Sequence, residues 1–81
     1  MRIPRDVDGL ELAKSLEAFD YHITRQTGSH VRLTTTRGGE HHITIPRYRP
    51  LKVGTLSSIL KDIAEHMRVS KEELIRELWG G

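Results

Sequence analysis

The sequence predicts an α+β fold in which helices cover one face of a three-stranded antiparallel sheet. Three observations predict it: a first segment with helical spacing of apolar residues, alternating apolar and polar residues over 21–46, and two further helical patterns after residue 52. A chain of 81 residues has room for two packed layers around one core. We therefore expect a single domain over 1–81 with the element order α-β-β-β-α(-α).

The first helix is expected to start at Asp8, which can cap it together with Glu11, three residues on. Its apolar stripe has helical spacing and consists of Leu12, Leu16 and Phe19. The helix is expected to end near Asp20.

Three strands are expected to follow, over 21–26, 30–35 and 42–45. The turn Thr27-Gly28-Ser29 separates the first two, Gly38-Gly39 separates the last two, and Pro46 ends the third. Alternation predicts a set that faces the helices: Val31, Leu33, Ile43 and Ile45. The other set then lies on an open face: His30, Arg32, Thr34, His42 and Thr44.

Residues 46–52 form a basic loop that two prolines hold extended. A second helix is expected after Gly54, with Thr55 as its N-cap and an apolar stripe that starts at Leu56. The pattern Ser70-Lys71-Glu72-Glu73 is a further capping box and predicts a short third helix.

The charge is concentrated in the middle of the chain. Residues 21–53 hold six Lys and Arg residues against a single acidic residue, Glu40, whereas acidic residues are in slight excess on both sides. A basic centre favours a polyanionic partner, for which nucleic acid is the leading candidate. The chain has no cysteine, no apolar run of signal-peptide length and no segment long enough to span a membrane, so we expect a cytoplasmic protein.

His30 is the best single catalytic candidate. It begins its strand directly after the Gly28-Ser29 turn, at what we expect to be the edge of the sheet, with Arg25 and Arg32 close in sequence. A base near neutral pKa beside fixed cations is what cleavage of an RNA phosphodiester requires. A solvated histidine without a chemical role is the alternative.

A second anion site is expected where the basic loop meets the second helix. Arg47, Arg49 and Lys52 precede the helix start at Thr55, where the helix dipole is positive. Tyr48 lies between the two arginines and can stack on an unpaired base. The alternative is that Thr55 only caps the helix and that the loop is merely solvated.

The sequence predicts no metal site and no cofactor. His41 and His42 are neighbours on a strand and point to opposite faces, so they cannot share an ion without distortion. His22 and His66 are expected to be exposed. Glycine-rich phosphate loops, nucleophile elbows and paired catalytic carboxylates are all missing from the sequence.

Several segments together resemble the HicA (YcfA-like) toxin family. They are Ile3-Pro4-Arg5, Arg25-Gln26-Thr27-Gly28-Ser29-His30-Val31-Arg32, Ile43-Thr44-Ile45-Pro46-Arg47, Leu51-Lys52, Gly54-Thr55-Leu56 and Ile59-Leu60. The resemblance spans nearly the whole chain. Extra residues over 62–68 distinguish this sequence from shorter members and lengthen the second helix.

The resemblance implies a fold similar to the double-stranded-RNA-binding domain and an mRNA interferase activity. This is a metal-independent endoribonuclease activity on mRNA, neutralised by a HicB-type antitoxin in a type II toxin–antitoxin pair. The family's catalytic histidine corresponds to His30. The residues expected to bind RNA are Arg25, Ser29, Arg32, Arg47, Arg49, Lys52 and Thr55. Two other functions remain open: a non-catalytic RNA-binding module of the same fold, and an interaction domain whose sheet edge pairs with another chain.

Overall fold

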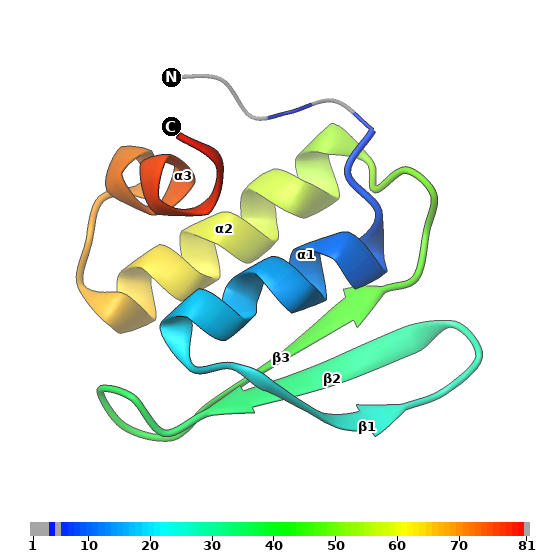
Figure 1. The fold of residues 1–81 in the computed structure, drawn as a ribbon, viewed down its shortest axis with the longest axis horizontal. Helices are drawn as coiled ribbons and strands as arrows, with labels where there is room; N and C mark the ends of the chain where they lie inside the picture. Colours follow the sequence, from blue (N-terminus) through cyan, green and yellow to red (C-terminus); the bar gives the residue numbers. More distant parts are fainter. Residues whose placement is uncertain (1–3, 5, 81) are drawn as a thin grey trace.

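The computed structural model describes residue 4 and residues 6–80 (Figure 1). Ile3 and Arg5, which contribute to the resemblance to the HicA family, lie outside the described residues. The elements follow in the order α1 (Gly9–Ser15), the 3-10 helix η1 (Leu16–Phe19), β1 (His22–Gln26), β2 (His30–Thr35), β3 (His41–Pro46), α2 (Val53–Met67) and α3 (Lys71–Trp79). The predicted α+β element order is confirmed.

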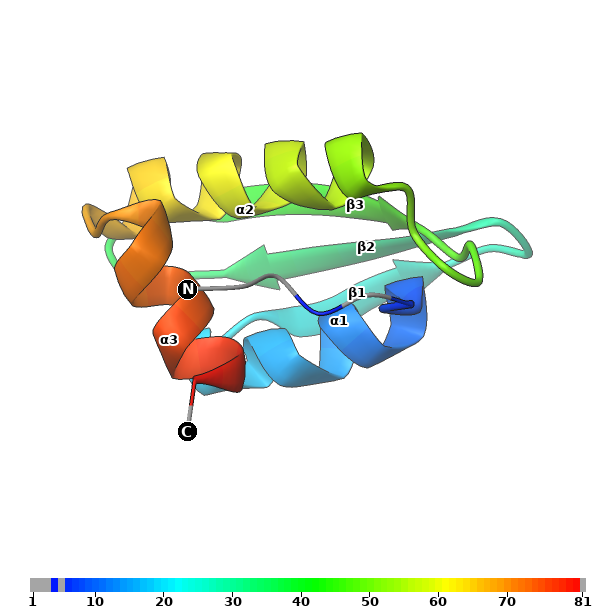
Figure 2. The ribbon, with the colours of Figure 1, turned by 90° about the horizontal axis from the view of Figure 1, so that it is seen from above.

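The three strands form one antiparallel sheet in the order β1-β2-β3. The helices lie on a single side of this sheet, as Figure 1 shows, and α3 crosses one end of the helical layer in Figure 2. The sheet therefore has one face packed against helices and one open face. No helix within the described residues is long and apolar enough to cross a membrane.

Strand alternation sorts the two faces as predicted. Val31, Leu33 and Ile45 are fully buried and Ile43 nearly so, while His30, Arg32, His42 and Thr44 are exposed. The helices complete the core with Leu12, Leu16, Leu56, Leu60, Ile63 and Leu74. Burying a side chain of this size stabilises a fold by about 1.5–3 kcal/mol, so the apolar face fixes which residues remain on the open one.

The start of α1 is fixed by its neighbours. The Asp8 N–H donates to Glu11 Oε2 at 3.5 Å, one arm of the predicted capping box. Gly9 follows and donates its N–H to the Tyr48 carbonyl at 3.1 Å. A Cβ at Gly9 would collide with the Pro46 carbonyl. The first helix therefore packs closely against the loop that leaves β3.

The start of α2 differs from the prediction. The helix begins at Val53 with Lys52 as its N-cap residue, so Thr55 lies inside the first turn and the predicted Thr55 cap is wrong. The reason is an anchor just before it: Leu51 is buried and donates its N–H to the Val7 carbonyl at 2.8 Å. With Leu51 held there, the chain enters the helix at once, and the Leu56 N–H donates to the Lys52 carbonyl at 2.9 Å.

The predicted cap of α3 is confirmed. Ser70 Oγ accepts a hydrogen bond from the Glu73 N–H at 3.0 Å and donates to Glu73 Oε1 at 3.2 Å. Ahead of it, α2 ends at Met67, and the left-handed backbone of its C-cap residue Arg68 (φ 58°) turns the chain toward α3. Leu74 and Ile75 then bury this short helix against the rest of the core.

Candidate active site on the open sheet face

A shallow hollow of about 200 Å³ lies on the open face of the sheet. Its lining comes from all three strands and the β1–β2 turn: Arg25, Thr27, His30, Arg32 and Thr44. The histidine and the two arginines singled out in the sequence thus share one hollow. Two cations beside an imidazole make it suited to a phosphodiester.

A β-bulge in β1 brings Arg25 to this face. Ile23 pairs with Leu33, yet the next pairing joins Arg25 to Arg32, so Thr24 is an extra residue in β1. Regular alternation from Ile23 would have put Arg25 on the same face as Ile23. The bulge changes this parity, and the two guanidinium groups line the same hollow.

His30 lies at the end of the central strand and not at the edge of the sheet. β2 has β1 on one side and β3 on the other, and His30 pairs with Pro46 of β3. The expected edge position was wrong, because the chain returns for a third strand on the far side of β2. Thr27 fixes the turn before it by accepting the His30 N–H at 3.0 Å on its hydroxyl.

The His30 ring is oriented by its sequence neighbour. Ser29 Oγ lies 3.0 Å from His30 Nδ1, within hydrogen-bond distance. Among the residues that the structure describes, no hydrogen bond of His30 Nε2 is found. The ring is exposed, so Nε2 is the nitrogen available to a substrate.

Arg47 reaches the same turn from the loop after β3. Its backbone N–H donates to the Ser29 carbonyl at 2.9 Å, and its side-chain Nη1 donates to the Thr27 carbonyl at 3.3 Å. These two bonds tie the loop to the backbone on either side of Gly28. Arg47, which the sequence placed in a second anion site, therefore also holds the turn that carries His30.

The remaining predicted RNA-binding residues stay apart from the hollow. Arg49 is highly exposed, and its Nε lies 3.8 Å from Asp8 Oδ2. Lys52 and Thr55 lie at the start of α2, and none of the three lines the hollow around His30. Tyr48, which lies between Arg47 and Arg49, is half exposed. Arg49 and Lys52 thus form a second cationic surface, beside the hollow that Arg25 and Arg32 line.

Tyr21, His41 and Asp62 form a hydrogen-bonded cluster on the helix side that sequence reasoning missed. The Tyr21 hydroxyl lies 2.7 Å from His41 Nδ1, and His41 Nε2 lies 3.3 Å from Asp62 Oδ1. Burial, together with the negative charge of Asp62, raises the pKa of Tyr21 to about 12. The three residues lie 20 or more positions apart in the sequence, so no local sequence pattern predicts this cluster.

His66 is not the exposed residue that was expected. Its ring stacks on His41 with centroids 4.3 Å apart, and its Nε2 lies 3.0 Å from the Arg37 carbonyl. It is half-buried, because the β2–β3 turn packs against the C-terminal part of α2. The expectation for His22 is confirmed, since that residue is exposed.

His41 and His42 point to opposite faces, as predicted. His42 lies on the open face, where its Nδ1 is 2.8 Å from Thr34 Oγ1 and its Nε2 is 2.8 Å from Glu40 Oε2. His41 faces the helices. Within residues 4 and 6–80 no group of three or more histidine or acidic side chains is arranged to hold a metal ion.

A family model described as the HicA toxin of bacterial toxin–antitoxin matches residues 9–64. The match runs from the start of α1 into α2 and includes every residue that lines the hollow. Neither the search of curated proteins nor that of solved structures found a match.

Proposed function

The chain belongs to the HicA family of toxins from bacterial toxin–antitoxin pairs, and on this premise we propose that it is an endoribonuclease that cuts mRNA with His30. The observation that carries the proposal is the shared hollow of His30, Arg25 and Arg32 on the open sheet face. The hollow combines two fixed cations with an imidazole that can accept a proton. These are the minimum groups that cleavage of an RNA phosphodiester needs.

In the proposed reaction His30 Nε2 takes the proton of a 2′-hydroxyl. The 2′-oxygen attacks the adjacent phosphorus, the bond from phosphorus to the 5′-oxygen breaks, and the leaving 5′-oxygen takes a proton from water. His30 then returns its proton to the solvent. The products carry a 2′,3′-cyclic phosphate and a free 5′-hydroxyl. Arg32 and Arg25 stabilise the additional negative charge that develops on the phosphoryl oxygens. No metal ion takes part in these steps.

Ser29 and Arg47 position His30 in this mechanism. Ser29 holds His30 Nδ1 at 3.0 Å, which keeps Nε2 free for the substrate. Arg47 binds the backbone carbonyls of Ser29 and Thr27 and so fixes the turn. A catalytic base held by packed neighbours keeps its geometry while the substrate enters.

The second cationic surface extends the RNA path beyond the cleaved bond. Arg49 and Lys52 neutralise phosphates further along the strand, Thr55 lies in the first turn of α2, and Tyr48 offers a ring for an unpaired base. As a family member the toxin pairs with an antitoxin, for which we infer the HicB type.

The test compares His30→Ala with His22→Ala, since His22 is an exposed histidine that does not line the hollow. Positioned acid-base catalysis contributes about 10²–10⁴-fold, so His30→Ala should lose message cleavage and toxicity to that extent, while His22→Ala retains both. Circular dichroism and RNA affinity should match wild type in both variants.

If His30→Ala still cuts RNA within a few fold of wild type, His30 is not the base. If wild type binds RNA and leaves it intact, the chain is a non-catalytic RNA-binding module. Product analysis separates these results, because only cleavage through the 2′-hydroxyl leaves a cyclic phosphate end.

A further inference from the structure

The open face of the sheet continues beyond the hollow that contains His30. The strand register pairs Arg32 with Thr44 and, two residues further along β2, Thr34 with His42. Directly paired residues point to the same face, so His42 lies on the open face beyond Arg32. Between His30 and Thr34 the strand advances about 13 Å, at a rise of about 3.3 Å per residue. An RNA strand that runs from His30 over Arg32 therefore passes His42.

Four side chains on this part of the face form a chain of hydrogen bonds. Glu40 Oε2 lies 2.8 Å from His42 Nε2, and His42 Nδ1 lies 2.8 Å from Thr34 Oγ1. Thr34 Oγ1 lies 3.2 Å from Thr24 Oγ1, and the Thr24 hydroxyl can also donate to the Arg32 carbonyl at 3.4 Å. The chain thus links β3, β2 and β1, and it ends at the bulge residue of β1.

Every side-chain proton of this chain is used inside it. The ionised Glu40 carboxylate only accepts, so His42 Nε2 carries a proton and donates it. When His42 is neutral, its Nδ1 accepts from Thr34, which in turn accepts from Thr24. When His42 is protonated, the direction reverses and Thr24 donates to the Arg32 carbonyl. In both states the four side chains offer a ligand acceptor atoms alone.

A row of acceptors disfavours phosphate and favours the N–H groups of a nucleobase. Phosphate oxygens also accept hydrogen bonds, and the Glu40 carboxylate repels their charge. Unpaired bases of RNA present N–H donors on their edges. Guanine has two neighbouring donors, N1–H and the N2 amino group, which match the two oxygens of a carboxylate. Adenine and cytosine instead present one amino group beside an acceptor, so guanine fits best.

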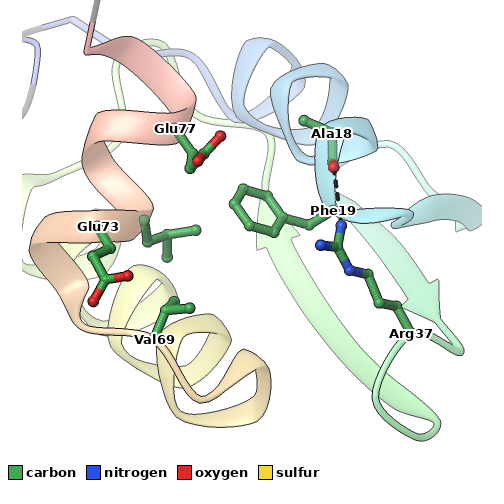
Figure 3. Close-up of a pocket in the computed structure, with 7 residues that line it drawn as sticks. Ala18, Phe19, Arg37, Val69, Glu73 and Glu77 are labelled. Atoms are coloured by element: carbon green, nitrogen blue, oxygen red, sulfur yellow. Dashed lines mark hydrogen bonds between the residues drawn. The ribbon is translucent and has the colours of Figure 1, made fainter.

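The Glu40 carboxylate is available for such a contact. Its side chain is 69% exposed, and within the described residues its one hydrogen-bond partner is His42. Arg37, the nearest arginine in the sequence, is turned toward η1. Its Nη1 donates to the Ala18 carbonyl at 3.4 Å, and its guanidinium lies 5.6 Å from the centre of the Phe19 ring (Figure 3). Arg37 is therefore not the partner of Glu40.

The position of Glu40 is unusual for a surface that binds a polyanion. It is the single acidic residue of the basic stretch 21–53. A carboxylate there lowers the affinity for an RNA backbone, and an exposed ion pair such as that of Glu40 with His42 stabilises a fold only slightly. A contact with a base explains the carboxylate better than the stability of the hairpin does.

We propose that Glu40 binds a guanine of the RNA strand and so gives cleavage a base preference. The guanine N1–H and N2 amino group donate to the carboxylate, and His42 is a positioning residue that holds Glu40 through Nε2. Because His42 pairs with Thr34, about 13 Å along β2 from His30, the guanine lies further along the RNA than the cleaved bond. This inference rests on the RNA substrate of the proposed function.

The experiment compares two forms of one mixed-sequence, single-stranded RNA. In the second form inosine replaces every guanine, which removes the N2 amino group alone. Affinities are measured with His30→Ala, so that the RNA stays intact, and with the same protein carrying also Glu40→Gln, His42→Phe or Glu65→Gln. Glu65 is an exposed carboxylate on α2, in the helical layer, so Glu65→Gln is the control with an equal change of net charge.

His30→Ala and the Glu65→Gln control should bind the guanine RNA about tenfold more tightly than the inosine RNA, because one hydrogen bond to a charged group is lost. With Glu40→Gln the two affinities should agree within about twofold, since the amide places a donor where the base needs an acceptor. His42→Phe should narrow the difference as well, because it no longer holds the carboxylate.

Cleavage of a random RNA pool by the wild-type protein gives the second measurement. Sequencing of the product ends should show guanine enriched at one fixed position away from the cleaved bond, and Glu40→Gln should remove this enrichment. Equal affinity of His30→Ala for the two RNAs, or an unchanged difference in Glu40→Gln, would overturn the guanine site and leave cleavage by His30 standing. If wild type leaves RNA uncut while the affinities still differ through Glu40, the nuclease proposal fails and the guanine site stands. A protein that binds neither RNA would overturn both.

Discussion

Arg25 and Arg32 are cross-strand partners on the open face of the sheet, and both line the hollow that contains His30. Two like charges directly opposite each other destabilise a strand pair, so this arrangement costs stability. A phosphodiester anion bound between the two side chains would relieve this repulsion. The pair is thus explained better by an anionic substrate than by the folding of the sheet.

Replacing Arg32 with alanine should therefore lower the cleavage rate by about 10²-fold, because one fixed cation of the transition state is lost. Arg32→Lys should recover part of this loss, since it keeps the charge without the planar fork. Single-turnover cleavage of one RNA oligonucleotide by the three proteins measures the effect. The idea is wrong if Arg32→Ala and wild type cleave at equal rates.

Removing Arg49 and Lys52 together should weaken RNA binding and flatten its dependence on salt. Each phosphate contact to a single strand contributes about 0.7 to the slope of log affinity against log salt concentration. Arg47 is excluded from this variant, because it also holds the His30 turn. Binding titrations at several salt concentrations give the slope, and an unchanged slope would place the RNA path elsewhere.

Chelation should leave cleavage unchanged, because a general base can activate the 2′-hydroxyl of the RNA without a metal ion. RNA cleavage is compared before and after treatment of the protein with EDTA, with a magnesium-dependent nuclease as the positive control for chelation. Loss of activity that returns with added Mg²⁺ or Mn²⁺ would contradict the mechanism.

Stability should fall in alkaline solution as the Tyr21 phenol titrates. Burial and Asp62 raise its pKa from 10.0 to about 12, so the folded state keeps a proton that the unfolded chain releases near pH 10. The contribution is complete below pH 10 and is lost as pH rises toward about 12; a shift of this size corresponds to at most about 3 kcal/mol.

Tyr21→Phe should abolish this alkaline loss of stability. Tyr48→Phe should show the same loss as wild type, because Tyr48 is half exposed. Urea unfolding between pH 9 and 11.5 gives the free energy of unfolding for each protein. Parallel pH profiles for wild type and Tyr21→Phe would show that Tyr21 does not cause the loss.

The sequence alone determined the elements and their faces. Successive side chains of a strand point to opposite faces of the sheet. Because Val31 and Leu33 must be buried against the helices, His30 and Arg32 must lie on the open face. Capping signals such as Ser70 with Glu73 act over one turn and are likewise visible in the chain.

Only the tertiary structure decided what depends on distant residues. The bulge at Thr24 that turns Arg25 to the open face, the central position of His30 and the early start of α2 after Leu51 all follow from contacts with other elements. The same holds for the stack of His41 on His66. Local spacing carries no information on these contacts, because they form between segments that the packed core brings together.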